Sequence, residues 1–108
     1  MSDLFQEREQ SYEAKFAHDE ALRFRIRARR DKLFARWAAG VLGLSDAQTE
    51  AVISDVLAIK DGPNHDQALK DHLRHMLRDH PQGSEASVSA AMDRCMTEAR
   101  AQLGGAVP

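Results

Sequence analysis

The stretch that decides the fold is residues 21–41, ALRFRIRARRDKLFARWAAGV. Its apolar side chains Ile26, Leu33 and Trp37 recur at helical spacing, so that at about 100° per residue they project into one sector. Neither Gly nor Pro interrupts the stretch before Gly40. This pattern predicts an amphipathic helix that turns one face toward a protein core.

Three further helices are predicted downstream, each from its own start and stop signals. The four helices of the fold are expected to begin near Leu22, Asp46, His65 and Ser84. The expected caps are Ser45 with Gln48, Asn64 with Gln67, and Ser84 or Ser87. Gly62-Pro63 is expected to stop the second helix, and the third is expected to run from about residue 65 to 79.

The apolar positions of these three helices are also spaced for one buried face each. The expected buried residues are Val52, Ile53, Val56 and Leu57, then Leu69, Leu73, Met76 and Leu77, then Val88, Met92, Cys95, Met96, Ala99 and Leu103. Short connections between such helices favour antiparallel neighbours. The sequence therefore predicts an all-α fold, a small antiparallel four-helix bundle over residues 21–104, with residues 105–108 as a frayed tail.

Residues 1–20 differ from the predicted bundle. Three of their aromatic side chains share the sector of the core-facing residues: Phe5, Tyr12 and Phe16. Asp19, Arg23 and Arg30 occupy the same sector further along, which interrupts the apolar seam. An isolated helix of this length is marginal in water. We therefore expect a boundary near residue 20 and a flexible, conditionally helical N-terminal arm that is largely disordered when free.

The arm has the pattern of a helix that binds in a partner's groove, because its aromatic residues fall at i, i+7 and i+11. Charged residues flank these anchors on the predicted helix: Arg8, Glu9, Glu13 and Lys15. Their charges would select the partner. The alternative is that this aromatic stripe docks on its own bundle as part of an ordinary first helix.

Charge is distributed unevenly along the chain. The formal net charge is −2, but residues 1–20 sum to −4 and residues 21–36 to +6. Four of the basic residues form one stripe on the predicted helix: Arg25, Arg29, Lys32 and Arg36. This stripe suits an acidic protein surface, a nucleotide phosphate or water alone. Nucleic acid is not expected, because the acidic segment upstream would repel a phosphate backbone.

Sequence signals of catalysis are missing. The chain has no phosphate loop, no dinucleotide fingerprint, no nucleophile elbow and no CxxC motif. His72 and His75 share a helix face that Asp79 could extend, but further metal ligands are not specified. We predict no enzyme activity, no catalytic residue, no metal and no cofactor. The single cysteine, Cys95, favours a reducing compartment, and the short apolar runs exclude a transmembrane helix.

The sequence resembles the zeta subunit of alphaproteobacterial F-type ATP synthases. The likeness covers residues 5–39 and rests on EAKFA at residues 13–17, ARR at residues 28–30 and WAA at residues 37–39. The later helices agree in layout. Asp31 departs from the pattern, since relatives are expected to carry an amide there.

This resemblance implies an inhibitor of ATP hydrolysis by the F1 sector. The arm would enter a catalytic interface between alpha and beta subunits, near the gamma stalk, while the bundle stays outside. The implied partner-binding residues are Phe5, Arg8, Glu9, Tyr12, Glu13, Lys15, Phe16 and Asp19. The protein would be a monomer when free, without membrane insertion, and cytoplasmic, associated through the ATP synthase with the cytoplasmic face of the inner membrane.

Two other functions fit the residues. One is a helical adaptor for protein interactions whose long first helix belongs to the bundle. The other is a regulator that binds purine nucleotides, ATP or ADP, weakly through Arg25, Arg29 and Lys32 of the Arg-rich helix.

Overall fold

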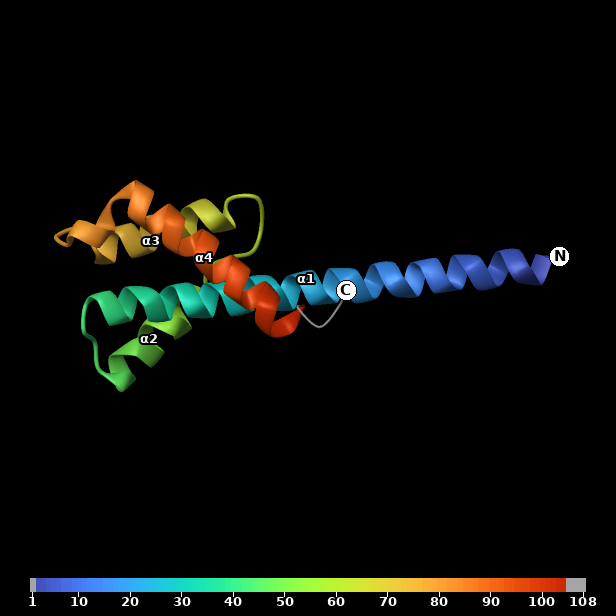
Figure 1. Ribbon diagram of the computed structural model, residues 1–108, viewed down its shortest axis with the longest axis horizontal. Helices are drawn as coiled ribbons and strands as arrows, with labels where there is room; N and C mark the ends of the chain where they lie inside the picture. Colours follow the sequence, from blue (N-terminus) through green and yellow to red (C-terminus); the bar gives the residue numbers. More distant parts are fainter. Residues whose placement is uncertain (1, 105–108) are drawn as a thin grey trace.

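The computed structural model describes residues 2–104, and their side chains from residue 19 onward. This part of the chain is helical and contains no strand (Figure 1). Its elements are α1 (Ser2–Val41), α2 (Asp46–Leu57), α3 (His65–Met76), the short 3-10 helix η1 (Pro81–Gly83) and α4 (Glu85–Leu103). The predicted all-α class is therefore confirmed. The predicted tail, residues 105–108, lies outside the described residues.

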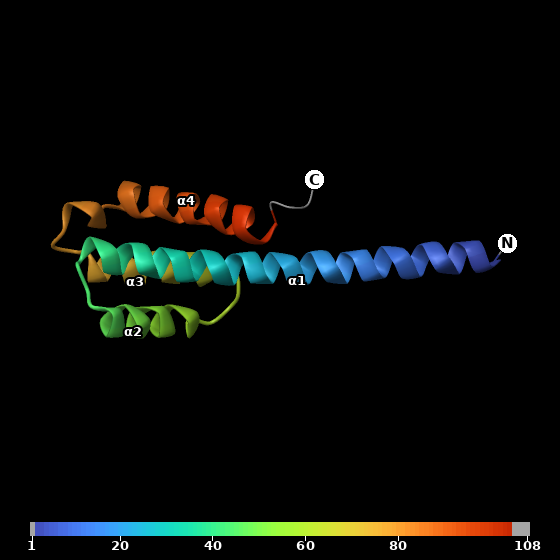
Figure 2. The ribbon, with the colours of Figure 1, turned by 60° about the horizontal axis from the view of Figure 1, so that its bottom comes forward.

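The bundle is organised around α1. Helix α1 contacts each of the other three helices, and its contacts with α4 and α2 are the most extensive. In Figure 2, α4 and α2 lie on opposite sides of α1, and α3 lies behind it. The chain direction alternates from each helix to the next, which gives the predicted antiparallel four-helix arrangement.

The first helix is longer than the sequence predicted. We expected a helix start near Leu22, but α1 is continuous from Ser2 to Val41, a length of 40 residues. The absence of Gly and Pro before Gly40 allows this continuity. In both views, residues 2–20 extend beyond the other helices (Figures 1 and 2). The helix has no break near residue 20, where α1 leaves the bundle (Figures 1 and 2).

The core is built mainly from small and branched side chains. Its largest fully buried members are Phe34, Leu69, Leu73, Leu77, Val56 and Val88. Trp37 is only partly buried and stacks on Phe34, with the ring centroids 5.8 Å apart. Phe34, which is completely buried, is therefore the main aromatic residue of the core.

Most of the predicted buried faces are confirmed, with one clear exception. Val52, Ile53 and Val56 are buried on α2, whereas Leu57 at the end of this helix is 51% exposed. Leu57 has the spacing of the buried face, but α2 ends at this residue and no other described helix covers it. The remaining differences are partial: Ile26, Leu33, Val41, Met76, Met96 and Leu103 are half-buried.

The predicted caps are largely confirmed. Ser45 and Gln48 form both hydrogen bonds of the capping box at α2. The Ser84 hydroxyl accepts from the Ser87 N–H at α4, which decides between the two candidates. Asn64 makes no side-chain cap at α3, so this prediction was wrong. The Gln67 side chain instead donates to Asp71 one turn later.

The connection from α3 to α4 explains why α3 ends at Met76 rather than near residue 79. The His80 N–H donates to the Leu77 carbonyl, and the His80 ring accepts from the Gln82 N–H to start η1. A Cβ at Gly83 would lie 2.1 Å from the Leu77 carbonyl oxygen, so only glycine fits this close turn.

Candidate functional site

The predicted basic stripe lies on the outer side of α1 within the bundle. Arg25 and Arg36 are exposed, and Arg29 and Lys32 are half-buried. Within residues 19–104, none of these four cations forms an ion pair or a hydrogen bond through its side chain. The stripe is therefore a set of positive charges whose counter-charges are not supplied by the described part of the chain.

Exposed apolar side chains lie beside this stripe. Phe24 is 55% exposed and Leu57 is 51% exposed, although both are large hydrophobic residues. A shallow groove of about 290 Å³ connects them with the basic residues. We call this surface the Phe24 patch; it is lined by Phe24, Arg25, Ala28, Arg29, Lys32, Leu57 and Leu103. An apolar centre with a charged rim is typical of a protein interaction site.

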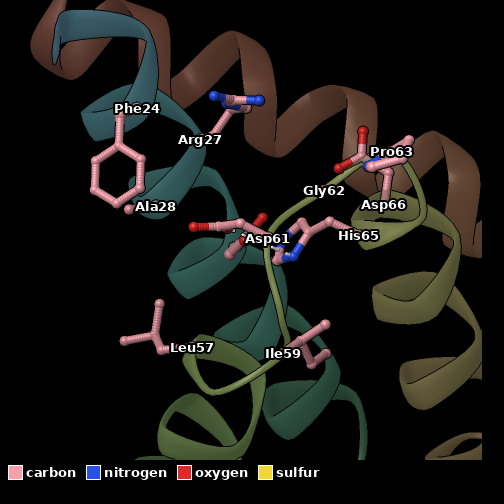
Figure 3. Close-up of a pocket in the computed structure, with 11 residues that line it drawn as sticks. Phe24, Arg27, Ala28, Leu57, Ile59, Asp61, Gly62, Pro63, His65 and Asp66 are labelled. Atoms are coloured by element: carbon pink, nitrogen blue, oxygen red, sulfur yellow. Dashed lines mark hydrogen bonds and ion pairs between the residues drawn. The ribbon is translucent and has the colours of Figure 1, made fainter.

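A larger cavity of about 510 Å³ opens on the other side of Phe24. Figure 3 shows Phe24 and Ala28 of α1 and Leu57 of α2 along one side of it. Asp61 and His65 lie near the middle of the same view, next to the connection that leads from α2 to α3. The cavity thus has an apolar side and a polar side.

The polar side belongs to an ion network, centred on a buried arginine, that joins α1 to the start of α3. Arg30 is 3% exposed and Asp31 is 4% exposed. The guanidinium of Arg30 donates from Nε to Asp31 Oδ1 (2.9 Å) and from Nη1 and Nη2 to the two carboxylate oxygens of Asp66 (3.2 and 2.7 Å). Asp31 Oδ2 lies 2.6 Å from Nε2 of His65. Two carboxylates therefore bind one buried arginine, and His65 binds one of these carboxylates.

The electrostatics of this network keep Arg30 and Asp66 charged. Burial alone lowers the pKa of Arg30, but the hydrogen bonds and charges of Asp66 and Asp31 outweigh it, so the pKa is raised. The hydrogen bonds from Arg30 lower the pKa of Asp66, against a smaller opposing effect of burial. The bidentate geometry with Asp66 is the form in which Arg binds a carboxylate most strongly.

The role predicted for Arg30 was wrong. We had taken it, with Asp19 and Arg23, as an interruption of the apolar seam. The structure buries Arg30 together with Asp31 and pairs it with the exposed Asp66, so the packing surface of α1 continues through it. The exposed Arg23 pairs with Glu20 at 3.3 Å, and Asp19 is half-buried. The adjacent Arg30-Asp31 pair was a local signal, but its partners lie more than 30 residues away.

The predicted arm residues are only partly described. The side chains of Phe5, Arg8, Glu9, Tyr12, Glu13, Lys15 and Phe16 lie outside the described residues, and their backbone belongs to α1. Of the predicted partner-binding set, Asp19 alone has a described side chain. The role of the other residues in this set stays a prediction.

The remaining candidate residues do not form a chemical centre. His75 is exposed and lies near Arg78, and His72 is half-buried on the same helix. Across the described residues, no group of three or more His, Cys, Asp or Glu side chains could hold a metal ion. Cys95 is buried, and burial raises the pKa of its thiol, which leaves it protonated and unreactive at neutral pH. No described helix is both long and apolar enough to cross a bilayer.

Comparison with known proteins gives one match. No curated protein and no solved structure shows a significant similarity to the chain. A family model described as ATPase inhibitor subunit zeta matches residues 1–102, which include the arm and the four helices except the last residue of α4. Proteins of this family regulate an ATPase rather than catalyse a reaction. The chain therefore belongs to the ATPase inhibitor subunit zeta family.

Proposed function

We propose that this protein blocks ATP hydrolysis by inserting residues 1–20 as a helix into a catalytic interface between alpha and beta subunits of F1, near the gamma stalk. The observation that carries the proposal is the extension of α1 beyond the bundle (Figures 1 and 2). At about 1.5 Å per residue, residues 2–20 form a helix about 28 Å long. This length suits insertion into a cleft between two subunits.

The arm would act as a wedge. Hydrolysis requires the catalytic interface to close, and a helix lodged in the interface occupies the volume that closure needs. Ordering a free segment costs about 2–5 kcal/mol of the gross interaction energy. We propose that Phe5, Tyr12 and Phe16 supply more than this by filling desolvated pockets. Arg8, Glu9, Glu13, Lys15 and Asp19 would add charge complementarity.

The bundle would act as a stop and as a second contact. Because α1 runs without a break from the arm into the bundle, the orientation of the bundle sets the direction of the arm. The Phe24 patch faces outward where α1 leaves the bundle, and Arg25, Arg29 and Lys32 line it. We propose that this patch, with the exposed Arg36, binds an acidic surface of the ATPase. The protein would then be monomeric when free and located at the cytoplasmic face of the inner membrane.

The test is inhibition by a truncated protein. Deletion of residues 2–19 is expected to abolish inhibition of F1 hydrolysis, while thermal unfolding of the bundle stays nearly the same. Full inhibition by the truncated protein would exclude the arm as the inhibitory element. A triple variant, Arg25→Glu, Arg29→Glu and Lys32→Glu, tests the Phe24 patch and is expected to weaken inhibition about tenfold, mainly through slower association. Arg94→Glu, an exposed arginine on α4, is the matched control and should change little.

A second candidate function is weak binding of a purine nucleotide at the Phe24 patch. The observation that favours it is an exposed aromatic ring beside three cations without described partners, since a ring can stack on a base while cations bind phosphate. Titration with ATP or ADP at physiological salt would shift the amide signals of residues 24–32. Unchanged signals over this segment would exclude the nucleotide function and leave the inhibitor function intact.

A further inference from the structure

The connection between α2 and α3 is held in place by Ile59, which packs against the core, and by the hydrogen bonds of His65. This connection, residues 58–64, leads into His65, the first residue of α3. His65 lies beside Asp31 of α1 in the lining of the larger cavity, and Gly62 and Pro63 of the connection line the same cavity (Figure 3). Its imidazole therefore bridges three parts of the chain.

The hydrogen-bond partners of His65 define its protonation state. Nε2 lies 2.6 Å from Asp31 Oδ2, and Nδ1 lies 3.1 Å from the Lys60 carbonyl oxygen. A carboxylate and a carbonyl can only accept hydrogen bonds, whereas a neutral imidazole has one N–H to donate. Both bonds form together only when both ring nitrogens are protonated. The observed geometry is therefore that of a cationic histidine.

The charges around His65 come from every element that packs against it. Helix α1 contributes the anion Asp31 and the cations Arg27 and Arg30; the connection contributes Asp61, whose carboxylate is 3.9 Å from Nδ1; and α3 contributes Asp66. The side chains of the central pair are 12% exposed for His65 and 6% exposed for Asp31. Water therefore screens their attraction only weakly.

We propose that His65 and Asp31 form a pH-operated latch, which holds the connection between α2 and α3 against α1 while His65 is protonated and releases it when the proton is lost. Loss of the proton leaves His65 with one donor for two acceptors. Either the bond to Asp31 or the bond to the Lys60 carbonyl then breaks. The connection gains freedom, and the wall of the cavity that it forms can open.

The direction of the pH effect follows from the surroundings of the imidazole. Burial lowers the pKa of His65, and Arg30 lowers it further, but the hydrogen bonds to Asp31 and Lys60 and the charge of Asp31 outweigh them, so the pKa is raised above 6.5. A group whose pKa is raised on folding stabilises the protein fully below its unfolded pKa. This stability is lost as the pH rises through the folded pKa. The latch is therefore closed in acid and opens as the pH rises through the raised pKa of His65.

The first test is an NMR titration of the imidazoles in the full chain. We expect His65 to titrate above 6.5 and to show two ring N–H protons at low pH. In the variant Asp31→Asn, the midpoint is expected to fall by about one pH unit or more, because the anion that raises it is gone. Asp61→Asn is the matched control: it removes an exposed carboxylate from the other side of the ring and should shift the midpoint less. A wild-type midpoint at or below 6.5 would overturn the latch.

The second test follows the connection itself. The amide signals of Asp61 and Gly62 are expected to move with the same midpoint as the His65 ring, and in His65→Gln this movement should vanish because glutamine does not titrate. Movement of these amides that persists in His65→Gln would overturn the latch, as would a wild-type connection that does not respond. The wild-type titration decides the matter even where a variant fails to fold. Inhibition of F1 does not enter either test, so the result is independent of the proposed function.

Discussion

Residues 21–41 of α1 lie among the other three helices, whereas residues 2–20 of the same helix extend beyond all of them (Figures 1 and 2). Both halves consist of good helix formers, and neither contains Gly or Pro before Gly40. The half inside the bundle buries Phe34, Ala35 and Ala38 completely. Helix propensity is therefore high along all of α1, but tertiary packing within this chain stabilises only residues 21–41. The other half requires a partner to be stabilised in the same way.

Replacement of Phe34 tests residues 21–41, the part of α1 that packs in the bundle, and it has the largest expected effect. Phe34→Ala removes a fully buried ring at the centre of the core and should lower the free energy of unfolding by about 3–5 kcal/mol. Urea denaturation measures this loss. Phe24→Ala is the matched control, because it removes the same ring from an exposed position of the same helix. Equal losses at the two positions would contradict the division of α1 into a packed and an outward surface.

Replacement of the predicted aromatic anchors tests residues 2–20, the part of α1 that extends beyond the bundle. Tyr12→Ala or Phe16→Ala should weaken inhibition of F1 by about 30-fold, which corresponds to about 2 kcal/mol for a buried aromatic contact. The urea midpoint of the free protein should stay the same, since neither ring is expected to belong to its core. A large loss of stability without a loss of inhibition would assign these rings to the bundle.

A cap mutation in the bundle tests whether stability can be lowered without a change in inhibition. Ser45→Ala removes the hydroxyl that accepts from the Gln48 N–H at the start of α2 and should cost about 1 kcal/mol of stability. Inhibition at saturating protein should not change, because α2 is far along the chain from the arm. Thr49→Ala is a control at the same helix start, as its hydroxyl donates back to the Ser45 carbonyl and caps nothing. Reduced inhibition by Ser45→Ala would show that a loss of bundle stability also weakens inhibition. This result would contradict separate roles for the two halves of α1.

Local signals made much of the fold predictable. The capping box at Ser45, the cap at Ser84 and the buried stripes of α2, α3 and α4 each depend on residues within one or two turns of one another. The exposure of Leu57 was not predictable from its spacing, because it depends on where the next helix lies. The length of α1 was missed since a change in packing partner leaves no mark on the backbone pattern.

The candidate site was less predictable than the fold. The basic residues Arg25, Arg29 and Lys32 were identified from their spacing, but Phe24 beside them was not singled out as an exposed residue. The network of Arg30, Asp31, His65 and Asp66 joins positions 34 to 36 residues apart in the sequence. Such contacts form only when α3 packs against α1, so local sequence patterns do not predict them.

The most direct measurement of the central claim is amide hydrogen exchange over residues 12–17 in the free protein and in its complex with F1. We predict rapid exchange in the free protein, because residues 2–20 extend beyond the other helices, and strongly slowed exchange in the complex. The amides of residues 33–39 should be protected in both states. Strong protection of residues 12–17 in the isolated protein, or rapid exchange that persists in the complex, would contradict the account.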